Sequence, residues 1–341
     1  MEGLYRNCAL CPRNCHVDRN AGGVGFCGET STLRAAWAGI HLGEEPVLTG
    51  KGGSGTVFFS GCTLRCPFCQ NCQLSGPGWR QGPSGPVREV KGSLGVEITP
   101  AFLAGLFLRL QYAGAENVNL VTGTHFAPGI LEALRQARSG GLAIPALWNS
   151  CGYEGTGTVE LLAREVEVFL PDCKTLDPEL SRWLFRAPDY PQATREAILL
   201  MAEARPLLLG EETLKQGVIV RHLVLPGQLE STRSVLEWFR EALYGRALLS
   251  LMFQYTPVPV GPGVLAGGVR TLLPGLERQT NALEVEQVLL WLEELGIKEG
   301  FVQEPETSAG WWPDFLRPNP FPEGQARPLW HCLYGELNPL R

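Results

Sequence analysis

Three cysteines, Cys62, Cys66 and Cys69, lie on one short segment with the spacing C-x3-C-x2-C. Three thiolates at this spacing can bind three irons of a cubane iron–sulfur cluster, which leaves the fourth iron without a protein ligand. Clusters that only transfer electrons usually have four cysteine ligands, whereas catalytic metals keep an open position. The spacing therefore predicts a catalytic [4Fe–4S] cluster. A zinc site with Cys72 as the fourth ligand is the alternative.

Four more cysteines, Cys8, Cys11, Cys15 and Cys27, precede this segment. Four thiolates complete a metal site, so this second site is expected to be closed, and either structural or electron-relaying. The spacing fits both zinc and a second iron–sulfur cluster, and a closed four-cysteine site in a short module favours zinc. Reduced thiols without a metal are the other alternative, but so glycine-rich a segment has little core to fold around.

The cysteine distribution and the charge restrict the class of protein. Eight of the eleven cysteines fall between Cys8 and Cys72. Disulfides rarely persist in the cytoplasm, and clustering at short spacing indicates metal ligation. The start of the chain has no apolar signal-peptide core, and no apolar run approaches the ~20 residues of a membrane span. The net charge of −6 argues against a nucleic-acid partner. We expect a cytoplasmic protein with neither membrane nor nucleic-acid partners.

The elements that must position these cysteines alternate between strand and helix, which predicts a parallel sheet with crossover helices. About six βα units fit the 341 residues, and they suit an open, partial barrel. Thr99 and Pro100 indicate one helix start, as N-cap and first helical residue. The expected strands are 56–60, 118–122, one ending at 146–148, 166–170, 217–224, 248–252 and 301–302. The expected helices lie near 100–113, 128–138, 157–164, 177–185, 190–204, 231–243 and 282–295.

We divide the chain into three parts. Residues 1–50 form a Cys-rich metal-binding module, 51–305 the α/β barrel, and 306–341 a C-terminal extension. Within the barrel, residues 75–95 are rich in Gly, Pro and Ser and are expected to form an exposed loop.

The cysteine loop resembles a known family. Cys62-x3-Cys66-x-Phe68-Cys69 after a first strand is similar to the motif of the radical S-adenosylmethionine (SAM) superfamily. From about residue 8 to about residue 305 the chain resembles uncharacterised relatives of pyruvate formate-lyase activating enzyme. The Gly-Gly-Glu segment typical of the true activating enzymes is replaced by Thr-Gly-Thr-His at 122–125. The segments that carry the resemblance are 119–126, 148–154, 170–174, 186–190, 221–227 and 250–255.

The resemblance implies an open partial (β/α)6 barrel of radical SAM type that binds a [4Fe–4S] cluster and SAM. Reductive cleavage of SAM would then give a 5′-deoxyadenosyl radical that abstracts hydrogen from a substrate. The resemblance implies a glycine of a partner glycyl-radical enzyme as one candidate substrate, beside other proteins and small molecules. It also implies an electron donor such as flavodoxin or ferredoxin. A non-catalytic zinc or redox-binding module is the alternative function.

Polar residues follow the ends of the expected strands, and the carboxyl ends of barrel strands form one active-site rim. Residues 122–124 are expected to hold the ammonium of SAM, and 149–150 its ribose. Lys174, oriented by Asp172, is expected at the carboxylate, and by the resemblance Phe68 packs beside the adenine. A core role is the alternative for His222, and a structural role for Gln254. The expected cofactor-binding residues are Phe68, Thr122, Gly123, Thr124, His125, Asn149, Ser150, Asp172, Lys174, Arg221, His222 and Gln254.

Overall fold

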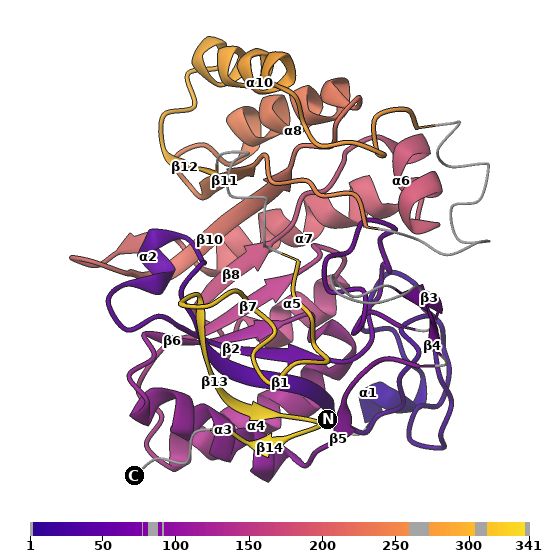
Figure 1. The fold of residues 1–341 in the computed structure, drawn as a ribbon, viewed down its shortest axis with the longest axis vertical. Coiled ribbons are helices and arrows are strands. Elements are labelled where there is room, and N and C mark those ends of the chain that lie inside the picture. Colours follow the sequence, from indigo (N-terminus) through magenta and orange to yellow (C-terminus); the bar gives the residue numbers. More distant parts are fainter. Residues whose placement is uncertain are drawn as a thin grey trace.

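The computed structural model describes residues 3–76, 78–80, 88–90, 92–258, 273–303 and 312–337. Within these ranges the chain has a mixed α/β fold around one large sheet (Figure 1). Seven parallel strands form the centre of this sheet and lie side by side in chain order. They are β2 (Ser54–Phe59), β6 (Asn117–Val121), β7 (Ala146–Ser150), β8 (Val168–Pro171), β10 (Leu214–Leu223), β11 (Leu248–Met252) and β12 (Gly300–Gln303).

One or two helices follow each of the first six parallel strands. Because the strand order always advances in the same direction and crossovers are right-handed, the helices cover one face of the sheet. In Figure 1 they follow the sheet from α3 and α4 at one end to α8 and α10 at the other. This agrees with the predicted open partial barrel, and β12 adds a seventh strand. The helices are α3 (Pro100–Tyr112), α4 (Ala127–Ser139), α5 (Thr156–Leu162), α6 (Pro178–Phe185), α7 (Tyr190–Ala204), α8 (Leu229–Ala242) and α10 (Ala282–Glu294).

Local capping residues set the starts of several helices. The Thr99 side chain accepts a hydrogen bond from the Phe102 N–H at 3.1 Å, as predicted for the N-cap of α3. Asn281 and Glu284 form a reciprocal capping box at the start of α10. Each such cap stabilises its helix by about 1 kcal/mol. None of the helices in the described ranges is long and apolar enough to span a bilayer.

Antiparallel strands extend the sheet beyond β2. β1 (Arg34–His41) pairs with β2, and β13 (Ala326–His331) pairs with β1. The sheet therefore runs across both divisions expected from the sequence, at residues 50 and 305, and that division stays a prediction. The remaining short elements are α1 (Gly3–Arg6), α2 (Pro46–Thr49), η1 (Thr124–Phe126), β3 (Gly78–Arg80), β4 (Arg88–Val90), β5 (Val96–Glu97), β9 (Leu208–Leu209) and β14 (Gly335–Glu336).

The predicted loop at 75–95 contains a short hairpin, because β3 and β4 pair antiparallel. Its residues 77, 81–87 and 91 lie outside the described residues. The first described strand after this loop, β5, pairs with the start of β1. The expected loop therefore contains two short paired strands, at 78–80 and 88–90.

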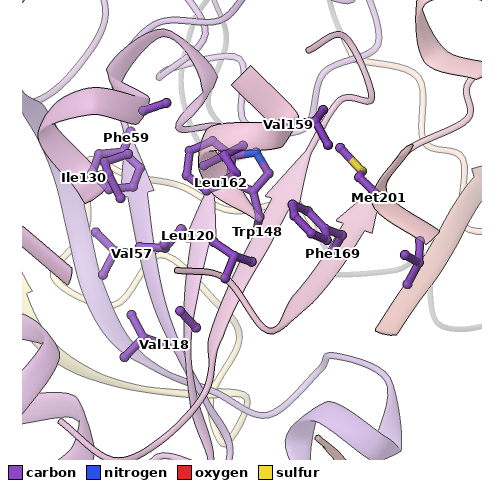
Figure 2. Close-up of a cluster of buried hydrophobic side chains, with 14 of the residues drawn as sticks. Val57, Phe59, Val118, Leu120, Ile130, Trp148, Val159, Leu162, Phe169 and Met201 are labelled. Carbon is purple, nitrogen blue, oxygen red and sulfur yellow. The ribbon is translucent and has the colours of Figure 1, made fainter. Parts of the chain in front are cut away.

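The main core lies between the parallel strands and the helices. Figure 2 shows Leu120, Trp148 and Phe169, from three neighbouring strands, packed among helix side chains that include Ile130 and Leu162. All five side chains are fully buried. Burial of each such side chain stabilises the fold by roughly 1.5–3 kcal/mol. This layer holds the strand ends, and the residues that follow them, in a fixed arrangement.

The other face of the parallel strands carries buried polar residues beside a second apolar cluster that includes Leu147, Leu170 and Ile219. Successive side chains of a strand point to opposite faces, so Asn119, Arg221 and Ser250 point away from the core formed by their neighbours. Arg221 forms ion pairs with Glu44 and Glu45, which lie just before and at the start of α2. Burial would raise the pKa of Glu45, but Arg221 lowers it below its ordinary value. This face therefore holds buried charges that compensate one another.

Candidate cluster and cofactor site

The three-cysteine loop begins directly after β2, at the carboxyl end of the strand. Cys62 is buried, whereas Cys66 and Cys69 are partly exposed. The N–H groups of Leu64 and Arg65 donate to the Cys62 sulfur at 3.4 and 3.5 Å. Hydrogen bonds of this kind surround the sulfur ligands of iron–sulfur clusters and tune their potentials. The backbone of the loop therefore already donates hydrogen bonds to the sulfur of Cys62, one of the three expected ligands.

The structure does not by itself identify the metal of this loop. In the described part of the chain, no three His, Cys, Asp or Glu side chains gather closely enough to hold one metal ion. Cys72, the fourth ligand of the zinc alternative, is buried beside the loop. The cubane on Cys62, Cys66 and Cys69 therefore stays a prediction from their spacing in the sequence.

Lys174 and Asp172 follow β8 and approach the same loop. The Lys174 Nζ lies 2.6 Å from the Asp172 Oδ2, and both side chains are largely buried. Burial alone would lower the pKa of Lys174, but Asp172 and the sulfur of Cys66 raise it above its usual range. The ammonium is therefore charged at neutral pH. The structure brings this ion pair and the cysteine loop together, as the order of the strands predicts.

Residues after β6 and β7 form a second part of this rim. Thr122 has φ +59°, a conformation that is strained for a β-branched residue. Such strain is concentrated at functional sites and costs about 1–3 kcal/mol. The Thr124 hydroxyl donates to the buried Glu154 at 2.7 Å, and Ser150 accepts from the Gly152 N–H at 3.3 Å. These contacts join the segments after the two strands.

Glu154 and Cys151 are rim residues that were not among the expected site residues. Burial raises the pKa of Glu154 above its ordinary value. The Cys151 sulfur lies 3.3 Å from the hydroxyl of Thr63, inside the cysteine loop. Both residues belong to the segment 148–154. Their position directly after an expected strand is the feature of the sequence that could have identified them as site residues. Only the packing of β7 against the loop after β2 shows that they lie here.

His125 lies behind the cysteine loop. Its Nε2 is 2.6 Å from the carbonyl oxygen of Ser60, and the imidazole is buried. Burial and the charge of Arg19 together lower its pKa to about 3. His125 is therefore a neutral side chain that contacts the segment leading into Cys62.

The aromatic residue of the motif lies in a buried cluster beside the cysteines. Phe68 packs against Phe185 and Tyr255, with ring centroids 6.2 and 5.9 Å apart. Cys62 and Cys151 belong to the same buried group. Of the other expected residues, Asn149 is half-buried on β7, and its carbonyl accepts from the Thr122 N–H at 2.8 Å. Gly123 packs against Ile130 and Trp148, and Gln254 follows β11.

The structure separates the neighbours Arg221 and His222. Arg221 points to the face of the sheet opposite the main core, where it pairs with Glu44 and Glu45. His222 points instead to α8. The His222 Nδ1 lies 2.6 Å from the Cys173 carbonyl, and its Nε2 lies 3.0 Å from the Thr232 hydroxyl. The structure thus places His222 in the core between strand and helix, away from the cysteine loop.

His222 should make the stability of the fold depend on pH. Burial lowers its pKa to about 4, below the value of about 6.5 for an unfolded chain. Its contribution is therefore complete above pH 6.5 and is lost as the pH falls toward 4. We expect this histidine to reduce the free energy of unfolding by about 2 kcal/mol between pH 7 and pH 5. Urea unfolding at both pH values tests this, and a His222→Gln variant with the full wild-type pH dependence would contradict it.

The amino-terminal cysteines form a second group that lies against the first. Cys8 and Cys27 are buried, and Cys11 and Cys15 are partly exposed. Burial raises the pKa of Cys11, and the charges of the other three thiols raise it further. The Phe26 N–H donates to the Cys15 sulfur at 3.5 Å, which resembles the contacts at Cys62.

Comparison with known proteins gives distant likenesses. No protein-family model matches the chain. The uncharacterized protein MJ0674 of Methanocaldococcus jannaschii is 28% identical over 257 residues, which cover 75% of this chain and 68% of that protein.

Solved structures are similar at lower identity. A radical SAM methyltransferase from Sphaerobacter thermophilus is 14% identical, with a TM-score of 0.47, over 80% of this chain and 70% of that one. A domain of pyruvate-formate lyase-activating enzyme from Bacteroides vulgatus is 12% identical, with a TM-score of 0.36, over 52% of this chain and 91% of that domain. With its three-cysteine loop directly after β2, the chain resembles the radical SAM superfamily.

Proposed function

We propose that this protein is a radical SAM enzyme in which Cys62, Cys66 and Cys69 bind a [4Fe–4S] cluster. The observation that carries the proposal is the approach of the charged Lys174 to the loop that carries the three cysteines. The electrostatic influence of Lys174 acts on both Cys62 and Cys66. An ammonium beside an open metal position is suited to a ligand that carries a carboxylate, as SAM does.

When bound, the cluster and SAM supply the chemistry, which is the reductive cleavage of SAM to methionine and a hydrogen-abstracting 5′-deoxyadenosyl radical. The protein supplies binding and orientation. Lys174 holds the carboxylate of SAM, and Asp172 fixes the position of the ammonium. The strained backbone at Thr122 and the hydroxyl of Thr124 face the amino group. Asn149 and Ser150 hold the ribose, and Phe68 packs against the adenine.

The surroundings of the loop support this assignment because they exclude water. Phe68, Tyr153, Phe185 and Tyr255 form a buried aromatic group beside Cys62. Tyr190 closes the gap between the segments after β7 and β8, since its hydroxyl lies 2.9 Å from the carbonyl oxygens of Cys151 and Asp172. A rigid, apolar wall of this kind protects reactive species from side reactions with solvent.

Two classes of substrate fit the proposed hydrogen abstraction. A glycine of a partner glycyl-radical enzyme is one candidate, and another protein or a small molecule is the other. The electron donor is a low-potential protein such as flavodoxin or ferredoxin. The net charge of −6 gives no support to a nucleic-acid substrate.

Anaerobic incubation with SAM and dithionite tests the function without knowledge of the substrate. We expect the reconstituted protein to release 5′-deoxyadenosine and methionine in equal amounts. The control omits dithionite and should release neither. A protein that binds iron or zinc but cleaves no SAM would instead be a non-catalytic metal-binding module, which would contradict the proposal.

Lys174→Ala should weaken SAM binding. A charge-assisted hydrogen bond to the SAM carboxylate is lost, at a cost on the order of 1.5–3 kcal/mol. Equilibrium binding of SAM under anaerobic conditions measures the loss, and the iron content should stay that of the wild type. Lys51→Ala is the matched control, because Lys51 forms an equally short but exposed ion pair with Glu212. Equal SAM affinity in the wild type and Lys174→Ala would remove Lys174 from the pocket.

A further inference from the structure

Arg13 joins two segments that lie far apart in the sequence. It lies between the second and third of the amino-terminal cysteines, and its Nε donates to the Thr63 carbonyl oxygen at 3.1 Å. Its two terminal nitrogens donate to the carbonyl oxygens of Arg186 and Phe185, at 2.5 and 2.6 Å. One guanidinium therefore holds the loop that carries the expected cluster ligands at a fixed separation from the end of α6.

The end of α6 is a favourable place for a cation. Phe185 is the last residue of α6 and Arg186 is its C-cap. The last carbonyl groups of a helix have no partner within the helix, and they carry a partial negative charge. Arg13 satisfies two of them and the Thr63 carbonyl at the same time. A lysine could not replace it, because only a guanidinium presents several donors in a rigid, planar fork.

An aromatic ring makes a second contact between the amino-terminal module and the loop. The Phe26 ring contacts two guanidinium groups, with the Arg13 Cζ 3.8 Å and the Arg65 Cζ 4.9 Å from the ring centroid. A guanidinium at this distance is attracted to the face of the ring. Arg65 and Thr63 both belong to the stretch between the first two cysteines of the loop. The module therefore holds this stretch at two points.

The end of α6 that Arg13 holds is also part of the wall around the aromatic residue of the motif. Phe185 is 1% exposed, and its ring centroid lies 6.2 Å from that of Phe68 and 5.2 Å from that of Tyr190. The proposed function places the adenine of SAM against Phe68. A shift of Phe185 would therefore move the surface that receives the adenine.

The contacts of Arg13 are separate from those that the proposed function assigns to the methionine part of SAM. Lys174 and Asp172 pair with each other after β8. None of the contacts that the structure describes for Arg13 involves either residue. Removal of the Arg13 side chain should therefore affect one end of SAM and leave the other end in place.

We propose that Arg13 is a positioning residue for SAM, which holds the cluster loop and the end of α6 at the separation that the adenine requires. The inference rests on the proposed function, because SAM is the ligand that is positioned. Arg13 acts through the residues that it holds, Thr63 in the loop and Phe185 in the aromatic wall. The amino-terminal module thus has a role in cofactor binding, whichever metal its cysteines bind.

Binding of SAM and of its two parts to the reconstituted protein tests this role. Methionine has the ammonium and carboxylate of SAM without the adenine, and 5′-deoxyadenosine has the adenine without those groups. Arg13→Ala should weaken the binding of SAM and of 5′-deoxyadenosine about tenfold and leave methionine binding unchanged. Lys174→Ala should instead weaken the binding of SAM and of methionine, and leave 5′-deoxyadenosine binding unchanged. Equilibrium dialysis under anaerobic conditions measures all three affinities.

Two further variants make this comparison decisive. Arg6→Ala removes an exposed arginine of the same module and should match the wild type with all three ligands. Arg13→Lys keeps the charge but not the fork of donors, so it should behave like Arg13→Ala, and it takes the place of that variant if Arg13→Ala does not fold.

Three results would overturn the proposal. The first is equal SAM affinity in the wild type and in the Arg13 variants. The second is an equal loss of methionine and 5′-deoxyadenosine binding. The third is loss of the loop cluster from Arg13→Lys, because Arg13 would then serve the cluster and not the placement of SAM. The proposed function fails separately, if the wild type contains the loop cluster and neither binds nor cleaves SAM.

Discussion

Replacement of Cys62, Cys66 and Cys69 by alanine will abolish the SAM-dependent change in the iron–sulfur spectrum and all release of 5′-deoxyadenosine. The three thiols are the protein ligands expected for the cluster, so their loss removes the site at which SAM is expected to bind. Anaerobic absorption spectra with and without SAM, and chromatography of the nucleoside product, measure both losses. Total iron is the weaker readout, because the amino-terminal cysteines are themselves expected to bind a metal, either zinc or a second iron–sulfur cluster.

Two further variants make this result specific. Cys72→Ser should retain the SAM response, because Cys72 is buried beside the loop and is not one of the three expected ligands. Cys332→Ser, at a half-buried cysteine outside both groups, should behave like the wild type. If the triple variant keeps a SAM-responsive cluster, the assignment of these ligands is wrong. If Cys72→Ser loses the response as the triple variant does, Cys72 must be added to the site.

Gly61→Ala will reduce the free energy of unfolding by about 2–5 kcal/mol, the sum of a backbone penalty and a steric one. Gly61 has φ +81°, which costs an L-residue roughly 1–2 kcal/mol. Its new Cβ would lie 2.5 Å from the Cγ of Glu29 and 3.0 Å from the Nε2 of His125. Both neighbours are buried, so the amino-terminal module must move away from the loop.

Gly22→Ala is the matched control for this experiment. Gly22 has nearly the same φ, +83°, but a Cβ there would meet nothing within 4 Å. It should therefore show the backbone penalty alone. Denaturant unfolding of both variants separates the two costs. Equal destabilisation of the two variants would show that the close approach at Gly61 contributes nothing.

Much of the barrel can be predicted from the sequence, because parallel strands buried on both sides are short apolar runs between turn residues. β2, β6, β7, β8, β10 and β11 all lie within a few residues of their expected positions. The Thr99–Pro100 pair predicts the start of α3, because an N-cap acts through neighbouring residues only. The cysteine spacing likewise predicts the types of ligand without any knowledge of the fold.

β1 and β13 were missed for a physical reason. β1 contains Ala35, Ala36 and Ala38, and alanine has a weak preference for strands. It is also buried on both sides, so it shows no alternation of apolar and polar residues. Its partner β13 lies almost 300 residues further along the chain, and the pairing of Trp37 with His331 is a long-range contact. No local pattern specifies such a partner.

The sequence by itself determined the ligand types, their spacing and the order of the strands that carry them. Tertiary structure decided which polar residues share a face. His222 lies within an expected strand and Lys174 just after one, and both were expected at the cofactor, yet packing directs His222 to α8 while Lys174 lies at the cysteine loop. The contact of Cys27 with Gly61 and the burial of Arg19 also arise only when distant segments pack together. The periodicity and spacing of residues determine which helix, strand or ligand set a segment can form. Which other segments pack beside it depends on how the whole chain buries its apolar surface.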